Sequence, residues 1–153
     1  MGITALAWAA GFVDGEGCIS ITVRKPRRAQ RTPQYTAQLG VFNLDPAPLV
    51  KLHQMFGGTI YFRSRVSHLR AVGEWRIKGK NAAWALEQLR PFLIVKREQA
   101  ALAIHLHAIK RITGRAGLPI GLLQEFARIR EQVTTLKHQP YDLSAFAVSN
   151  VVN

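Results

Sequence analysis

The sequence contains a single cysteine, Cys18, and therefore cannot form an internal disulfide bond. It lacks a membrane span, because its longest apolar stretches, 3–13 and 100–106, fall short of the roughly 20 residues that crossing a bilayer needs. The N-terminus has neither the basic flank nor the small-residue cleavage site of a secretory signal. We therefore expect an intracellular protein without a targeting signal, in the cytoplasm of a prokaryote or inside an organelle.

Acidic residues are also scarce. The 153 residues include 9 Asp and Glu against 21 Lys and Arg, which gives a formal net charge of +12 and a pI near 10.9. The excess is largest within 18–80, where 12 cations face only Asp45 and Glu74, a net of +10. Such a charge predicts a polyanionic partner, with nucleic acid as the first candidate and an anionic membrane surface as the second.

The apolar residues predict one α/β domain over 1–153, with a core at about 3–113 and a C-terminal helical extension at about 118–138. Some segments alternate with the period of two expected of half-buried strands, and others have helical spacing. Strands are expected at 18–24, 34–43, 59–66 and 74–78, and helices at 3–13, 46–56, 81–89, 96–112 and 118–136. The strand pairs predict two hairpins in one twisted antiparallel sheet.

The predicted strands carry a polar face that suits nucleic-acid recognition. Arg can bond guanine edges and Gln adenine edges, while cations in the loop 25–33 can hold phosphates. A basic sheet face that is merely solvated is the alternative interpretation. The residues expected to contact DNA are Ser20, Thr22, Arg24, Lys25, Arg27, Arg28, Arg31, Gln34, Thr36, Gln38, Tyr61, Arg63, Arg65, Arg70, Glu74, Arg76 and Lys78.

Residues 9–17, AAGFVDGEG, resemble the motif of the LAGLIDADG homing endonucleases, a small-residue helix that ends in an acidic, glycine, acidic, glycine turn. Ala9 replaces the first leucine, and Glu16 is longer than the usual aspartate. The resemblance continues over about the first 110 residues through 42–45, 56–60 and 91–100. It implies an αββαββα core in which helices back a twisted antiparallel DNA-binding sheet.

The resemblance also implies a metal site at the end of the first helix. Glu16 and the carbonyl oxygen of Gly15 are the implied ligands of magnesium (Mg2+) or another divalent cation such as Mn2+. Such cations prefer oxygen ligands and support phosphodiester hydrolysis. Asn43 and Lys96 match family positions near the metals, so they are implied catalytic residues together with Glu16. Without the resemblance, Glu16 and Asn43 would be interpreted as turn residues and Lys96 as a solvated side chain.

Only one copy of the motif is present, and single-copy family members act as homodimers through the first helix. Ala7, Ala10, Gly11 and Asp14 are therefore implied at the dimer interface, where Asp14 is expected to satisfy donors near the helix seam. A symmetric dimer implies a nearly palindromic target in double-stranded DNA. The implied function is a site-specific homing endonuclease that leaves short 3′ overhangs. The alternative is a non-cleaving protein on the same fold, either an intron RNA maturase or a DNA-binding regulator.

Overall fold

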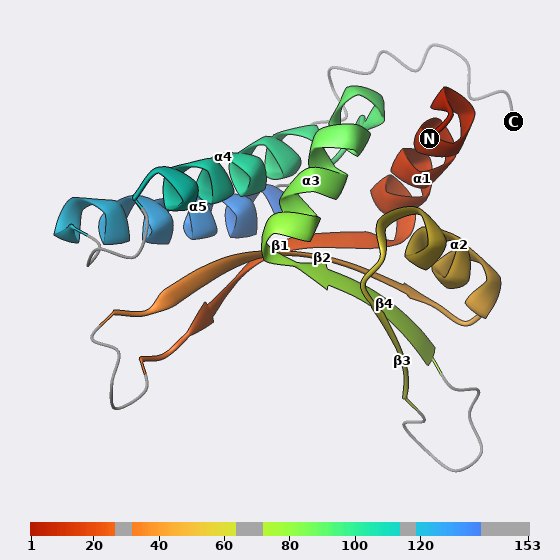
Figure 1. The fold of residues 1–153 in the computed structure, drawn as a ribbon, viewed down its shortest axis with the longest axis horizontal. Coiled ribbons are helices and arrows are strands. Elements are labelled where there is room, and N and C mark those ends of the chain that lie inside the picture. Colours follow the sequence, from red (N-terminus) through yellow and green to blue (C-terminus); the bar gives the residue numbers. More distant parts are fainter. Residues whose placement is uncertain (27–31, 64–71, 114–118, 139–153) are drawn as a thin grey trace, which may run out of the picture.

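Figure 1 shows a twisted sheet with its helices on one face. The computed structural model describes residues 1–26, 32–63, 72–113 and 119–138. In chain order the elements are α1 (Ile3–Glu16), β1 (Gly17–Arg24), β2 (Gln34–Asn43), α2 (Pro46–Phe56), β3 (Thr59–Arg63), β4 (Val72–Lys78), α3 (Gly79–Leu89), η1 (Arg90–Phe92), α4 (Arg97–Thr113) and α5 (Ile120–His138). No described helix covers the other face of the sheet (Figure 1), and the arrangement confirms the expected α/β fold class.

The four strands are antiparallel in the order β1-β2-β4-β3, so β2 and β4 join the two hairpins. Because strand residues alternate sides, the register fixes which side chains share a face. Odd-numbered residues of β1, β2 and β4 face the helices, where Ile19, Leu39 and Trp75 are fully buried. Even-numbered residues of these strands and odd-numbered residues of β3 lie on the opposite side, which we call the outer face.

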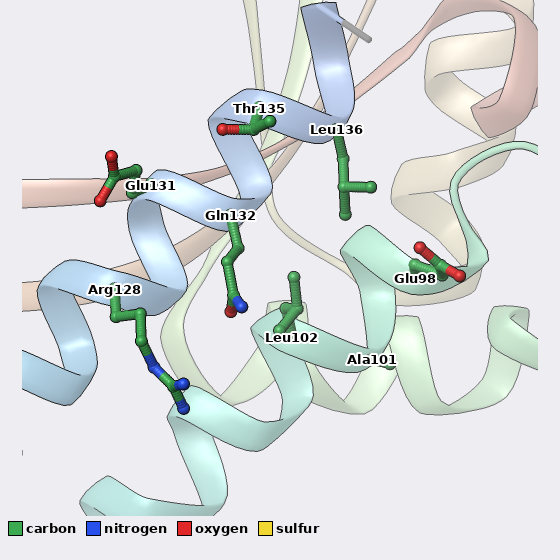
Figure 2. A pocket seen from close by; sticks show the side chains of 8 residues that line it. All are labelled: Glu98, Ala101, Leu102, Arg128, Glu131, Gln132, Thr135 and Leu136. Atoms are coloured by element: carbon green, nitrogen blue, oxygen red, sulfur yellow. The ribbon is translucent and has the colours of Figure 1, made fainter. Parts of the chain in front are cut away.

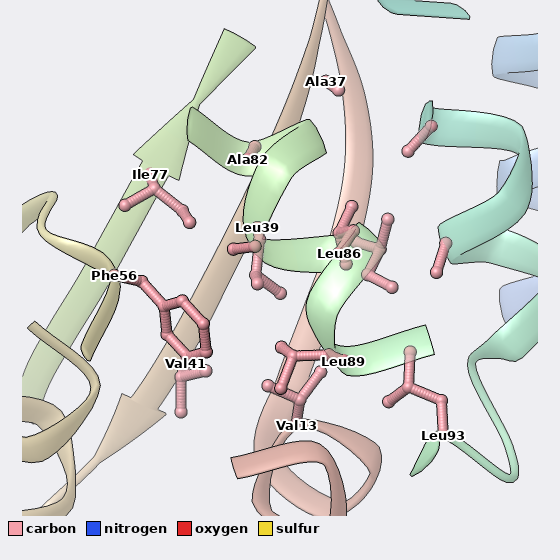
Figure 3. Packing of buried hydrophobic residues seen from close by; sticks show 14 of the residues in the cluster. Val13, Ala37, Leu39, Val41, Phe56, Ile77, Ala82, Leu86, Leu89 and Leu93 are labelled. Carbon is pink, nitrogen blue, oxygen red and sulfur yellow. The ribbon is translucent and has the colours of Figure 1, made fainter. Parts of the chain in front are cut away.

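Apolar side chains from the helices fill the space above the inner face of the sheet. Figure 3 shows Val13 of α1, Phe56 of α2 and Leu86 of α3 gathered around Leu39 of β2. Burying one such side chain contributes about 1.5–3 kcal/mol. The shared core therefore fixes α1 relative to the sheet.

α1 extends further than the sequence predicted and passes into β1 without a loop. The helix was expected to end at Val13, but it continues to Glu16, and the Gly17 N–H donates to the Val13 carbonyl oxygen. A side chain at residue 17 would block this direct passage, because its Cβ would lie 2.5 Å from the Val13 carbonyl oxygen. Glu16 is consequently held between a packed helix and a packed strand.

α2 begins and ends where the sequence predicted. The Asp45 carboxylate accepts a hydrogen bond from the Ala47 N–H at 2.9 Å, as an N-cap residue does. After Phe56, Gly57 and Gly58 adopt φ angles of 69° and 94°, a region that favours glycine. The Gly57 carbonyl also accepts from Trp75 Nε1 at 2.8 Å, which ties the end of α2 to β4.

α4 and α5 cover the hairpin formed by β1 and β2 (Figure 1). Phe126 of α5 packs against Tyr35, with ring centroids 5.8 Å apart. Lys110 of α4 donates from Nζ to the Tyr35 carbonyl oxygen, and burial lowers the pKa of this lysine. Both helices therefore hold the start of β2.

The remaining boundaries differ from the predictions by a few residues. β4 begins at Val72 rather than Glu74, and α5 begins at Ile120 and ends at His138. The predicted end of the third strand, at 66, lies outside the described residues. Within the described ranges, no helix is long and apolar enough to span a membrane.

Candidate nucleic-acid interface and metal site

The outer face brings together most of the predicted DNA contacts that the structure describes. The register places Arg24 opposite Gln34 and Thr22 opposite Thr36 in one hairpin, and the Thr22 hydroxyl donates to the Thr36 carbonyl oxygen at 3.1 Å. Gln38 has Ser20 on one side and Lys78 on the other. Hydrogen-bonding side chains therefore line the open side of three adjacent strands.

Away from the Lys78 end of β4, the outer face carries a hydrogen-bonded pair of side chains, Glu74 and Arg76. Glu74 is 2% exposed, and its Oε1 atom accepts hydrogen bonds from Nε and Nη2 of Arg76, the former at 2.7 Å. The Arg76 guanidinium lies 5.5 Å from the centre of the Tyr61 ring. Of the three, Tyr61 and Arg76 have exposed surface, whereas the Glu74 carboxylate is covered.

Several predicted DNA contacts are not placed. Arg27, Arg28, Arg31, Arg65 and Arg70 lie outside the described residues. Lys25 is exposed just beyond the end of β1, and Arg63 is the last residue of β3. The described outer face is therefore only part of the predicted basic surface.

Glu16 and Gly15 form the C-terminal end of α1, and both are exposed. Apart from its own helix, no described residue has an atom within 4 Å of the position that a Cβ would occupy at Gly15, so the described part of the chain leaves this end of the helix open. The last carbonyl groups of a helix lack intrahelical donors and carry partial negative charge. A carboxylate beside them makes the site favourable for a cation.

Asp14 connects the end of α1 to the start of α4. Its carboxylate accepts backbone hydrogen bonds from Ile94 at 2.6 Å, Val95 at 3.3 Å and Lys96 at 2.9 Å. The Lys96 ammonium donates in return to the backbone carbonyl oxygen of Asp14. These reciprocal bonds hold the Lys96 side chain at Asp14, which is two residues before Glu16 in α1.

Asn43 lies at the same end of the sheet as Glu16. Val41 pairs with Gly17 at the start of β1, and Asn43 follows two residues later at the end of β2. Its Oδ1 accepts from the Asp45 N–H at 2.8 Å, which is the turn role that an isolated Asn also predicts. The structure thus brings Glu16, Asn43 and Lys96 to one end of the molecule.

A single chain offers few metal ligands at this end. Over the described ranges, no group of three or more His, Cys, Asp or Glu side chains could hold a metal ion. Glu16 is therefore not part of a described cluster of three or more such side chains. Oxygen atoms from backbone, water, phosphate or a second Glu16 have the hardness that magnesium prefers.

One side of α1 remains available for a partner. Ile3, Ala7, Gly11 and Gly15 are exposed and recur at every fourth residue, so they form a stripe along the helix. Apart from α1 itself, nothing in the described ranges lies within 4 Å of a Cβ placed at Gly11. Ala10 differs from the expectation, because it is fully buried within its own chain and cannot add surface to an interface.

Three features of this region were not predicted from the sequence. Phe42 lies on the outer face and is 46% exposed, although the alternation of β2 already assigns its even position to that face. Lys51 lies over the Trp8 ring at 4.0 Å, and Trp8 stacks on Phe12. The bond between Asp14 and Lys96 spans 82 residues, so local sequence offers no signal for it.

A cavity of about 570 Å³ lies between α4 and α5. Figure 2 shows Leu102, Gln132 and Leu136 among the side chains that line it. Neither the end of α1 nor the outer face contributes to its lining. The cavity is therefore separate from the candidate site.

The sequence and the fold were compared with those of known proteins. The model of the LAGLIDADG endonucleases matches residues 9–93, more than half of the chain. The homing endonuclease I-CvuI, solved with its target in the presence of calcium, is 27% identical, with a TM-score of 0.72 over 90% of this chain and 84% of that one. An archaeal intron-encoded homing endonuclease, I-Vdi141I, solved with DNA, is 16% identical, with a TM-score of 0.72 over 93% and 91% of the respective chains. A search of curated proteins gave no match.

Proposed function

The chain belongs to the LAGLIDADG endonuclease family, and we propose that it is a homodimeric, divalent-metal-dependent homing endonuclease. Its proposed substrate is a long, nearly palindromic DNA duplex, cut in both strands with short 3′ overhangs. The observation that carries the proposal is the position of Glu16. This exposed carboxylate ends α1 and directly precedes β1, whose even-numbered residues begin the outer face. A ligand for a cation and a surface for DNA therefore meet at one junction.

The oxygen atoms at the end of α1 suit Mg2+ or Mn2+. Glu16 offers a carboxylate and Gly15 a carbonyl oxygen at the negative end of the helix dipole. A divalent cation held there supplies charge neutralisation at the phosphate and an activated water. Lys96 places a positive charge at the same helix end, where it can hold a phosphate oxygen. We assign Asn43, at the adjacent strand end, to ordering water beside that phosphate.

A second copy of the chain completes the proposed site. Pairing through the stripe of Ile3, Ala7, Gly11 and Gly15 would bring two α1 C-termini together, because the stripe runs to the residue before Glu16. Two neighbouring carboxylates repel each other unless a cation lies between them. Cation affinity and dimer stability are therefore expected to rise together. The symmetry of such a dimer accounts for the proposed palindromic target.

The decisive experiment substitutes Glu16 with glutamine. The amide keeps the shape of the side chain but removes the charge that attracts the cation, and the homodimer loses two such charges at once. A target is first selected from a library of randomised DNA duplexes by wild-type binding. We expect Glu16→Gln to bind this target with nearly unchanged affinity and to lose cleavage in magnesium or manganese. Glu87→Gln, an exposed acid on α3, is the matched control and should cut normally.

Two results would contradict the proposal. If Glu16→Gln cuts near the wild-type rate, Glu16 is not the metal ligand. If the wild-type protein binds selected DNA but cuts none of it with either metal, a non-cleaving maturase or DNA-binding regulator replaces the endonuclease.

A further inference from the structure

Arg76 is held in place on the outer face before any nucleic acid binds. Its Nε and Nη2 atoms both donate to Oε1 of Glu74. The Tyr61 ring flanks the guanidinium from β3, with 5.5 Å between the ring centre and the guanidinium carbon. Two neighbours therefore restrict a side chain that would otherwise populate many rotamers.

Glu74 is badly placed to contact DNA itself. Its side chain is 3% exposed, whereas that of Arg76 is 23% exposed. Phe42 and Tyr61 are its cross-strand neighbours, and Arg76 binds its carboxylate on the outer face. A bare carboxylate there would repel phosphates, but the guanidinium compensates its charge. Among the described residues, Arg76 is therefore the partner through which Glu74 can influence recognition.

The hydrogen bonds to Glu74 leave one edge of the guanidinium for a ligand. Three guanidinium hydrogens can still donate, and one of them on Nη1 forms with the second on Nη2 a fork that matches O6 and N7 of guanine. Gly40, the cross-strand neighbour of Arg76 on β2, has no side chain to cover this edge. We propose that Arg76 reads a guanine in the major groove and that Glu74 is the positioning residue for this contact. The proposal rests on the proposed function.

The register also indicates where this guanine lies in the target. Arg76 pairs with Gly40, which pairs with Cys18, two residues after Glu16. Strands lie about 4.8 Å apart, so the Arg76 backbone is about 10 Å from that of Cys18. Arg24 lies six residues further along β1, about 20 Å from Cys18. Arg76 should therefore read a base pair several positions closer to the cut than the base pair near Arg24.

The test compares base preferences along the target. DNA selected by the wild-type protein is varied one base pair at a time, and the affinity for each duplex is measured for Arg76→Lys, Arg76→Ala, Glu74→Gln and the double variant Glu74→Gln with Arg76→Ala. We expect Arg76→Lys to lose about 5- to 150-fold discrimination for guanine at one position in each half-site, with little loss at other positions. Glu74→Gln should weaken discrimination at the same position. Lys80→Ala, a control at an exposed lysine on α3 outside the predicted DNA contacts, should leave discrimination at this position intact.

The double variant separates positioning from a general structural effect. Once Arg76 is alanine, Glu74→Gln should change the preference at this position no further, because the proposed action of Glu74 there is to hold the arginine. Thermal unfolding checks that every variant is folded; if Glu74→Gln is not, Arg76→Lys alone decides. If Arg76→Lys keeps the wild-type base preference at every position, this inference is wrong, but the proposed endonuclease function is unaffected. Failure of the wild-type protein to select any DNA would instead remove the proposed function itself.

Discussion

Asp14 offers the sharpest test of how the end of α1 is supported. Its carboxylate accepts three backbone N–H groups at the start of α4, at 2.6, 3.3 and 2.9 Å. Substituting alanine removes all the acceptors and leaves three donors to water. Substituting asparagine keeps one oxygen, which can accept only some of these bonds.

The expected loss follows from the number of bonds. Removing an N-cap side chain costs about 0.5–2 kcal/mol, and hydrogen bonds to charged groups contribute about 1.5–3 kcal/mol each when well shielded. Asp14 is half-buried and its bond from the Ile94 N–H is short, so we expect Asp14→Ala to lose about 2–3 kcal/mol and Asp14→Asn about half of that. For a domain of this size, the larger loss lowers Tm by roughly 4–12 °C.

Urea unfolding and thermal scans at one fixed protein concentration measure these losses, because the stability of a dimer depends on concentration. Asp45→Ala is the control, since this N-cap carboxylate accepts one backbone N–H, at 2.9 Å, and should cost about 1 kcal/mol. A change below about 0.5 kcal/mol for Asp14→Ala would refute the reasoning, because ordinary surface substitutions fall in that range.

Two further predictions concern glycines. Gly11→Leu should yield a folded monomer that no longer cuts DNA, because residue 11 has free space in its own chain but lies in the proposed dimer stripe; light scattering checks this, with Gly121→Leu on α5 as the control. A dimer that survives Gly11→Leu would contradict pairing through this stripe. Gly58→Ala should lose at least about 3 kcal/mol, because its Cβ would lie 2.1 Å from Ile77 Cγ2, and Gly57→Ala only about 1–3 kcal/mol from backbone strain. Urea unfolding compares the two, and equal losses would show that the contact with Ile77 relaxes.

Most of the fold could be predicted because its signals are local. The alternation in 34–43 and the cap at Asp45 followed by Gly57 place β2 and α2 where the structure has them. The end of α1 was predicted wrongly, since Asp14 and two nearby glycines resemble a turn. The helix continues because Gly17 lets the strand begin directly against Val13, a three-dimensional fit that residue types do not reveal.

The candidate site could be predicted only in part, because some of its contacts depend on packing between elements that are distant in the sequence. The alternation of side chains along each strand was enough to assign Gln38 and Arg76 to the same face. It could not show that Glu74 on that face is buried and bound to Arg76, because burial depends on neighbours from two other strands. Ala10 was misplaced because a stripe of small residues does not show which of its members point toward the core.

The division of the sheet into an inner and an outer face determines which mutations can alter DNA recognition without disturbing folding. In β1 and β2, inner residues such as Ile19 and Leu39 build the core, while the intervening outer residues such as Ser20 and Gln38 contribute little to it. A mutation at an outer position can therefore alter the preferred DNA sequence with a small effect on folding. Recognition can drift one position at a time while the scaffold persists, and the same partition marks the outer positions as the natural ones to randomise in directed evolution. Glu74 is the exception, because its replacement alters the core-like environment and the recognition surface together.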